Sequence, residues 1–263
     1  MRLFPSVSPS RWLSLLPQAG AISAGLLLWS VTPSPADAAE LRQYRMREVQ
    51  INTCQIDLQK DTLRTYWKDD QGKVFGKFSQ LHTWLRDRNQ HIVCATNAGI
   101  YDKQLQPLGM YVEQGRQLRR LNQRQNAYGN FYMQPNGVFM ILDGQAKIVD
   151  TETLAADLPR WQQQARYATQ SGPIMLQNRV INMRFDPDSI NVATRNAVCT
   201  LNENQVILAI ARNPITFYDF AVFLRDRLDC VDALYLDGNI SRMSPSFDED
   251  LGPAFGAIIA VIK

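Results

Sequence analysis

The chain has 263 residues, with 28 basic and 25 acidic side chains, and its formal net charge is therefore +3. Apolar residues make up 45% and charged residues 20%, which is typical of a globular protein and excludes disordered, collagen-like and coiled-coil chains. So small a net charge argues against nucleic-acid binding, and no nucleic-acid partner is expected. Two histidines are too few for a three-histidine zinc site, so acid–base chemistry is expected from carboxylates, tyrosines or lysines.

The first 38 residues have the pattern of a secretory signal peptide. Arg2 and Arg11 are basic, residues 19–31 are an apolar run, and Ala36-Asp37-Ala38 supplies a small-x-small cleavage pattern. The run is shorter than the roughly 20 residues that a transmembrane helix needs, although an uncleaved anchor is the alternative interpretation. We therefore expect an exported, periplasmic or extracellular protein with one functional domain at 39–263 and no stable membrane span after cleavage.

The four cysteines are Cys54, Cys94, Cys199 and Cys230, and no two have the C-x-x-C spacing of zinc ribbons or thioredoxin-type redox sites. In an exported protein an even number favours disulfides, and three connectivities are possible. Four buried free thiols are the alternative. We expect one or two bridges and prefer Cys199–Cys230, because both residues lie near the ends of segments that flank the same helix.

In chain order, the hydrophobic pattern predicts more strands than helices. Strands are predicted at 48–58, 62–67, 91–96, 109–113, 138–142, 146–149, 197–201, 206–211, 231–236 and 257–262. Helices are predicted at 79–88, capped by Ser79, and from Thr216 to Leu228, where apolar residues follow helical spacing. Acidic residues 248–250 are expected to form a solvated loop. The elements are not regularly interleaved, so the predicted class is α+β, a single domain with a mixed, strand-rich central sheet and a few flanking helices.

Several common site motifs are absent from the sequence. It has no P-loop, no G-x-G-x-x-G and no G-x-S-x-G. Asp186-Pro187-Asp188 begins like a calcium loop but lacks its later Gly and Glu, so a solvated turn is preferred there. We expect no cofactor and no resident metal, while a divalent ion held by carboxylates and carbonyls stays an open alternative.

Five segments rich in Gly, Asn and hydroxyl residues adjoin predicted strands, at 96–101, 134–139, 169–173, 194–197 and 236–241. Each alone is typical of a turn. Together they are more informative, because polar loops at strand ends are where sites are often built on a rigid sheet. Their amides and hydroxyls suit a sugar, and Arg195 can make a two-point contact with phosphate or carboxylate.

In this order, the five segments resemble the phosphodiester glycosidase family. The matching blocks are Asn97–Tyr101, Ser171–Pro173, Arg195–Ala197 and Leu236–Gly238, and Pro135–Phe139 resembles a block of small exported bacterial members. The resemblance runs from about residue 50 to the C-terminus. Ala98 and Asn239 stand where the animal enzymes have glycine, which adds side chains near the expected pocket.

The resemblance implies an exported hydrolase that cleaves the bond between a sugar's anomeric carbon and phosphate in a sugar-1-phosphodiester. As a hypothesis, Asp237 acts at the anomeric carbon as nucleophile or general base, and Arg195 binds the phosphate. Glu152 is the expected second carboxylate, with Glu113 as the alternative. The expected partner is a sugar-phosphate or glycan substrate, and the sequence does not indicate an oligomeric state.

The remaining candidates would hold substrate oxygens. They are Asn97, Gly99, Tyr101, Asn136, Gln170, Ser171, Gly172, Asn196, Gly238 and Ser241.

Three other interpretations stay open. A non-catalytic module that binds cell-envelope glycans or anionic polymers would use the same loops, with Trp67, Trp84 and Trp161 as possible stacking surfaces. A metal-dependent phosphodiesterase would need His and Asp clusters, for which the chain has few histidines. In a purely structural interpretation, Asp237 caps a turn and pairs with Arg195 as a buried ion pair.

Overall fold

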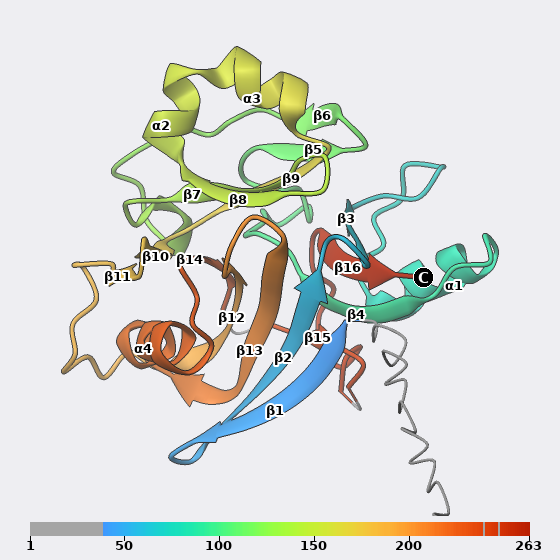
Figure 1. Cartoon of the computed structure of the whole chain (residues 1–263). Coiled ribbons are helices and arrows are strands. Elements are labelled where there is room, and N and C mark those ends of the chain that lie inside the picture. The colour runs from blue at the N-terminus through green and yellow to red at the C-terminus, as the bar shows by residue number, and fades with distance from the viewer. Residues whose placement is uncertain (1–38, 239, 247) are drawn as a thin grey trace, which may run out of the picture. The chain divides into compact units, whose positions relative to one another are not determined.

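The computed structural model describes residues 39–263 except Asn239 and Phe247 (Figure 1). The expected signal peptide and the departure at Asn239 therefore lie outside the described residues. The described residues belong to one compact unit, in which strands predominate over helices. The predicted α+β class is confirmed.

The largest sheet has seven strands in the order β1-β2-β13-β12-β14-β10-β11. Their bounds are β1 Glu40–Met46, β2 Val49–Asp57, β13 Gln205–Ile215, β12 Ala193–Thr200, β14 Asp232–Asp237, β10 Ile174–Gln177 and β11 Val180–Ile181. Residues 206–211 of β13 are all buried, because this sheet is covered on both faces.

Two smaller sheets complete the strand structure of the described residues. The four-stranded sheet has the order β15 (Met243–Ser244), β4 (Ile92–Asn97), β16 (Ile258–Ile262), β3 (Thr62–Tyr66). The five-stranded sheet has the order β6 (Arg116–Arg119), β5 (Tyr111–Glu113), β9 (Tyr167–Ser171), β7 (Gly137–Ile141), β8 (Ala146–Asp150). The uncharged strand β16 lies inside its sheet, as its sequence indicates.

The sheet arrangement differs from the expected mixed central sheet. Every strand pair within the three sheets of the described residues is antiparallel. Parallel neighbours need long crossover connections, whereas pairs such as β1–β2, β7–β8 and β12–β13 are joined by short turns. Hairpin connections therefore decide the strand direction.

The three sheets share one apolar core. Its buried side chains include Leu208 and Leu234 from the seven-stranded sheet, Val261 from the four-stranded sheet, and Phe139 from the five-stranded sheet. The opposite face of the seven-stranded sheet packs against α4 (Phe217–Arg227), which Figure 1 shows beside β12 and β13. The helix begins where the sequence predicts it, and Thr216 caps it, since its Oγ1 accepts from Asp219 N at 3.0 Å.

Helix α1 (Phe78–Arg86) covers the four-stranded sheet, but Ser79 does not cap it. The cap comes from Asp250, whose carboxylate oxygens accept from Phe78 N at 2.9 Å and Ser79 N at 3.0 Å. Asp248 forms an ion pair with Arg212. Residues 248–250 are therefore not the solvated loop that their charge suggested, because long-range partners satisfy two of the carboxylates.

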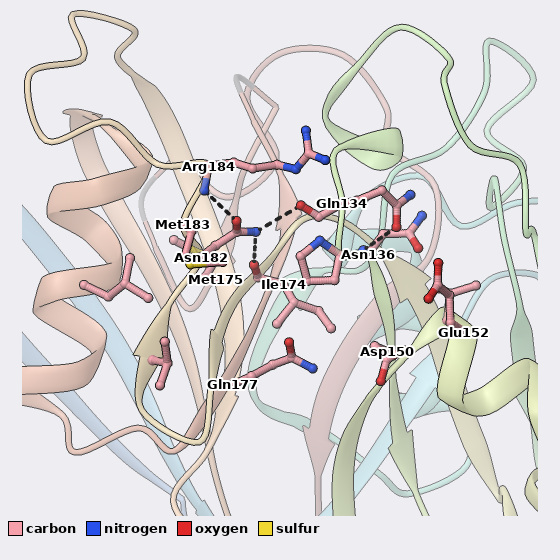
Figure 2. Close-up of a pocket in the computed structure, with 14 residues that line it drawn as sticks. Gln134, Asn136, Asp150, Glu152, Ile174, Met175, Gln177, Asn182, Met183 and Arg184 are labelled. Atoms are coloured by element: carbon pink, nitrogen blue, oxygen red, sulfur yellow. Dashed lines mark hydrogen bonds between the residues drawn. The ribbon is translucent and has the colours of Figure 1, made fainter.

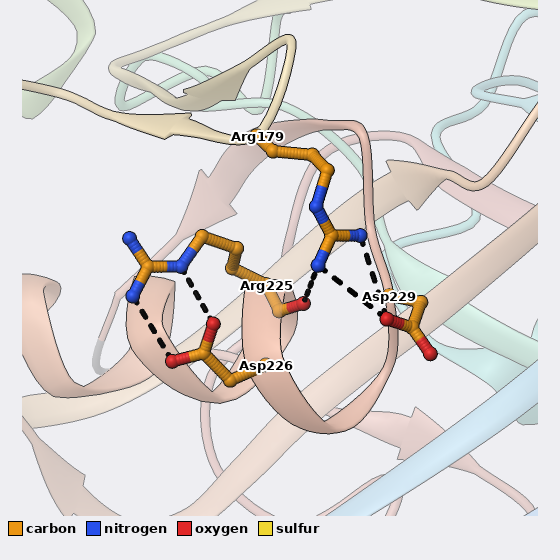
Figure 3. Close-up of polar contacts among 4 residues, drawn as sticks. All are labelled: Arg179, Arg225, Asp226 and Asp229. Carbon is orange, nitrogen blue, oxygen red and sulfur yellow. Dashed lines mark hydrogen bonds and ion pairs between the residues drawn. The ribbon is translucent and has the colours of Figure 1, made fainter.

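The remaining helical segments are α2 (Thr151–Ala156), α3 (Leu158–Gln164) and a 3₁₀ turn at Asn130–Tyr132. At the β11 edge of the seven-stranded sheet, side chains connect the β10–β11 turn to the C-terminus of α4 (Figure 3). Arg179 donates through Nη2 to Arg225 O at 3.1 Å and pairs with Asp229 at 3.4 Å. A cation at this end also complements the helix dipole.

Both possible disulfides of the four cysteines are formed. Cys199–Cys230 joins β12 to the segment after α4, which confirms the preferred pair, and Cys54–Cys94 links β2 to β4 in another sheet. Such bridges are typical of proteins outside the reducing cytoplasm. Within the described part of the chain, no helix is long and apolar enough to cross a membrane.

The double substitution Cys54→Ala/Cys94→Ala should lower the free energy of unfolding by about 4 kcal/mol, because this bridge closes a 40-residue separation and restricts the unfolded chain. Denaturant unfolding of the parent and variant would measure the loss. Mass counting of alkylated thiols in the unfolded parent should give none before reduction and four afterwards. Any thiol labelled before reduction would contradict one of the bridges.

Candidate functional site

A network of buried amides connects the ends of β14 and β4. Asn196, on β12, pairs with Asp237 in the sheet, and its Oδ1 accepts from Asp237 N at 2.8 Å. Its Nδ2 lies 2.9 Å from Asn97 O and 2.7 Å from Thr96 Oγ1, both on β4. One fully buried side chain therefore fixes the C-terminal end of β14 relative to that of β4, although the two strands belong to different sheets.

The carboxylate of Asp237 is held through both oxygens. Asn97 Nδ2 donates to Oδ2 at 2.9 Å, and Gly238 N donates to Oδ1 at 2.7 Å. Asn97 Oδ1 accepts from Arg242 N at 2.9 Å, which fixes the orientation of the Asn97 amide. The carboxylate is thus positioned before any substrate binds.

Ser241 folds the loop after β14 back onto this network. Its buried Oγ donates to Gly238 O at 2.6 Å and lies 3.1 Å from Asn196 Oδ1. Ser241 N also donates to Gly238 O, at 2.7 Å. The hydroxyl therefore shapes the Asp237 loop through main-chain contacts.

Burial raises the pKa of Asp237 to about 6. The bonds from Gly238 N and Asn97, and the positive charge of Arg242, oppose this rise. With a pKa near 6, Asp237 is mostly ionised at neutral pH but becomes protonated in mild acid. A carboxylate with these properties suits a nucleophile or a general base.

Arg242 is the cation of this site, and the sequence analysis missed it. Its Nε donates to Leu251 O at 3.1 Å and its Nη1 to Ser241 O at 2.8 Å, so the guanidinium is fixed by main-chain carbonyls. It is only partly buried. The available signal was its position, since it directly follows the polar segment that contains Asp237.

Tyr101 lies close enough for the charge of Asp237 to affect it. Burial raises the pKa of Tyr101, the negative charge of Asp237 raises it further, and Arg242 lowers it. Its buried hydroxyl has no hydrogen-bond partner among the described residues. Tyr101 is therefore a buried phenol within range of the Asp237 charge, and its hydroxyl has an unused hydrogen bond among the described residues.

Two of the expected substrate contacts, Gly99 and Ser171, have structural partners instead. Gly99 N donates to Thr169 Oγ1 at 3.3 Å, and a Cβ at Gly99 would lie only 2.4 Å from Gln170 O. Ser171 Oγ donates to Leu236 O at 2.9 Å and accepts from Ile100 N at 3.3 Å. These contacts hold the segment after β4 against β9, and they fix β9 to the residue that precedes Asp237.

Gln170 is also fully bonded within the protein. Its Oε1 accepts from Met110 N at 2.8 Å and Asn122 N at 2.9 Å, while its Nε2 donates to Asn122 O and Thr151 Oγ1. The side chain is 1% exposed. It anchors loop backbone and retains no free polar atom for a substrate, so the structure does not bring it to the site.

Arg195 is not brought to the site either. Successive strand residues face opposite sides, so Asn196 faces the network while Arg195 faces α4. Its Nε donates to Ile215 O at 2.8 Å, and its guanidinium carbon lies 3.6 Å from the Phe217 ring centroid. It forms no ion pair with Asp237 among the described residues. The geometry therefore supports neither the expected phosphate contact nor the alternative ion pair.

Glu152 and Asn136 line a different cleft, of about 440 Å³ (Figure 2). Glu152 lies in the first turn of α2 and its Oε1 accepts from Gln125 Nε2 at 3.1 Å. Gly172 contacts Asn136, and a Cβ at Gly172 would lie 2.6 Å from Asn136 Cβ.

The alternative carboxylate, Glu113, accepts from Tyr111 Oη at 2.8 Å, and burial raises the pKa of Glu113. Neither glutamate contacts Asp237 among the described residues.

Across the described ranges, no three His, Cys, Asp or Glu side chains are grouped so that they could hold a metal ion.

Replacing Arg195 by alanine should lower the free energy of unfolding by about 2–4 kcal/mol, because it empties buried space beside Phe217 and removes the buried hydrogen bond to Ile215 O. Denaturant unfolding would measure the change, with exposed Arg184→Ala as the control. A normally stable Arg195→Ala variant with specifically weakened phosphate affinity would restore Arg195 as a phosphate ligand.

The chain is similar in sequence and fold to several known proteins. Residues 90–244 match the phosphodiester glycosidase family, a range that includes Asn97, Asn196 and Asp237. The chain is 33% identical over 190 residues to the "Uncharacterized protein YigE" of Escherichia coli, covering 72% of this chain and 71% of that protein.

Two solved structures share the fold. The catalytic domain of zebrafish N-acetylglucosamine-1-phosphodiester alpha-N-acetylglucosaminidase, auto-inhibited by its pro-peptide, matches with a TM-score of 0.60 and 14% identity, covering 88% of this chain and 84% of that one. A hypothetical protein from Synechocystis matches with a TM-score of 0.50 and 14% identity, covering 84% and 61%. The matched sequence range and the relative at 33% identity establish that the chain belongs to the phosphodiester glycosidase family.

Proposed function

We propose that the protein hydrolyses the bond between a sugar's anomeric carbon and phosphate oxygen in a sugar-1-phosphodiester, at Asp237. The observation that carries the proposal is the Asp237 carboxylate itself: ionisable near pH 6, held on both oxygens, and placed at a strand end beside a cation. In the reaction the anomeric C–O bond breaks, water supplies the new hydroxyl, and a phosphomonoester leaves. Asp237 serves as nucleophile towards the anomeric carbon or as the base that activates the water.

Arg242 takes the phosphate role in this proposal, in place of Arg195. Its positive charge acts on Asp237 and its side chain is only partly buried, so it can approach the two non-bridging phosphate oxygens, which share one negative charge. Stabilising negative charge on the departing phosphate lowers the barrier, because that charge grows as the C–O bond breaks. The spare Tyr101 hydroxyl donates to a substrate oxygen in the same site.

We propose further that the protein is exported and that residues 1–38 are its signal peptide. The two disulfides support this compartment, since the cytosol keeps most thiols reduced.

The first test is product analysis on methyl phosphodiesters of several monosaccharide 1-phosphates. The parent should release free sugar and methyl phosphate, and Asp237→Asn should lower kcat/KM by at least about 1,000-fold because no carboxylate remains at the anomeric carbon. Asp232→Asn, a partly buried carboxylate on the same strand, is the matched control and should keep near-parental activity. Full activity of a folded Asp237→Asn variant would remove Asp237 from the reaction. Binding without hydrolysis by the parent would favour the non-catalytic glycan-binding alternative.

The pH dependence provides a second test. Since Asp237 must be ionised to act as nucleophile or base, kcat/KM should fall about tenfold per pH unit below about pH 6. Arg242 lowers the pKa of Asp237, so Arg242→Gln should move this acidic limb to higher pH as well as weaken phosphate binding. Arg225→Gln, at a distant exposed site, should leave the limb unchanged. A rate that instead falls above pH 6 would identify Asp237 as a general acid.

A further inference from the structure

We infer that the cleft lined by Asn136 and Glu152 binds a neutral sugar unit, so that the substrate is a glycan extending beyond the sugar phosphate at Asp237. This inference rests on the proposed function. The cleft lies between the N-terminal turn of α2 and the β10–β11 hairpin, and no residue of the Asp237 network lines it (Figure 2). Its volume, about 440 Å³, is within the usual range for small-molecule sites.

One residue of the cleft lining has an unpaired buried acceptor. Asn136 is 2% exposed, and its Nδ2 donates to Phe131 O at 2.9 Å. Its Oδ1 has no hydrogen-bond partner among the described residues. A buried acceptor without a donor costs about 1–3 kcal/mol, and a ligand hydroxyl would offset that cost.

The polar groups around Asn136 favour a hydroxyl-bearing ligand over phosphate. Asp150 uses Oδ1 to cap α2 through Thr153 N, and Glu152 uses Oε1 to accept from Gln125. The second oxygen of each carboxylate has no hydrogen-bond partner among the described residues. Among the described lining residues, two carboxylates and one cation, Arg184, give a net negative charge. Like charge repels an anion, whereas sugar hydroxyls donate to carboxylate and amide oxygens.

Apolar side chains also line the cleft, beside polar Gln177 and Asn182. They include Ile174, Met175 and Ile181, together with Met183, which is 96% exposed. Apolar walls with a few fixed polar groups are the usual construction of a site for an uncharged ligand, and they suit the C–H faces of a sugar ring.

The cleft is connected to the proposed reaction site through the largest sheet. Ile174 on β10 pairs with Leu234 on β14, the strand that ends at Asp237. Ser171, just before β10, donates to Leu236 O, next to Asp237. One rigid backbone therefore carries both sites, as a subsite for an extended glycan requires.

Methyl NMR of the protein labelled at methionine would test the inference, with neutral tetrasaccharides of glucose or N-acetylglucosamine and inorganic phosphate as probes. At least one tetrasaccharide should shift Met175 and Met183 saturably. Met110 and Met140, in a separate core cluster, should not move, and phosphate should shift neither cleft methionine. Absence of a saturable shift with every tetrasaccharide would overturn the inference, as would a response to phosphate alone.

Substitution at the cleft rim locates the binding. Gln177→Trp should weaken tetrasaccharide binding at least tenfold by filling the cleft, and Gln163→Trp, the same change on exposed α3, should leave it unchanged. Asn136→Ala should also weaken tetrasaccharide binding. Because Asn136 is buried, this variant can fail to fold, and the test then depends on Gln177→Trp, at an exposed position. Equal affinities of Gln177→Trp and parent would overturn the inference.

Two further measurements separate this inference from the proposed function. Gln177→Trp should still hydrolyse the methyl phosphodiester of a monosaccharide 1-phosphate, while Asp237→Asn should still bind the tetrasaccharide. Tetrasaccharide binding in the cleft by a parent that hydrolyses no phosphodiester would support the cleft and overturn the proposed function. Hydrolysis that depends on Asp237, without tetrasaccharide binding in the cleft, would support the proposed function and overturn the inference about the cleft.

Discussion

The buried amide of Asn196 is the contact on which the candidate site depends. It accepts from the main chain of Asp237 and donates to the main chain of Asn97, so it holds two strands of different sheets at a fixed separation. Asn97 can bond the Asp237 carboxylate only because this separation is fixed. Buried amides that satisfy main-chain groups are stable in one arrangement, because any shift would leave a polar atom unpaired. The Cys54–Cys94 bridge joins the same two sheets covalently and adds to this constraint.

The same burial gives Asp237 its chemical character. Removal from water raises its pKa, and two donors with a neighbouring guanidinium limit the rise, so the group titrates near pH 6 instead of becoming permanently protonated. Arg195 illustrates the opposite outcome. It is the more deeply buried of the two arginines, but its Nε and Nη2 donate to main-chain carbonyls and its guanidinium stacks on the Phe217 ring. A buried arginine with such partners stabilises the fold, whereas the partly exposed Arg242 remains available to a substrate.

Local patterns predicted much of the fold, and their failures have identifiable causes. The helix after Thr216 and the buried strands followed from apolar spacing, because burial on both faces of a sheet requires continuous apolar residues. The capping of α1 by Asp250 could not be found locally, since the carboxylate comes from more than 170 residues away. Gln170, Ser171 and Gly99 lie in site-like segments, but their polar groups bond neighbouring backbone, which depends on which strands become neighbours.

The sequence by itself determined the α+β class, the preferred Cys199–Cys230 pair, and the segments that contain Asn97, Asn196 and Asp237. These features depend on residue type and short-range spacing, or on a resemblance carried by contiguous motifs. Only the tertiary structure decided that Arg242 lies beside Asp237, that Arg195 faces α4, and that Glu152 and Asn136 share another cleft. The physical reason is that strand alternation and sheet packing decide which face a side chain occupies, and a one-residue difference, as between Arg195 and Asn196, places neighbours on opposite sides of a sheet.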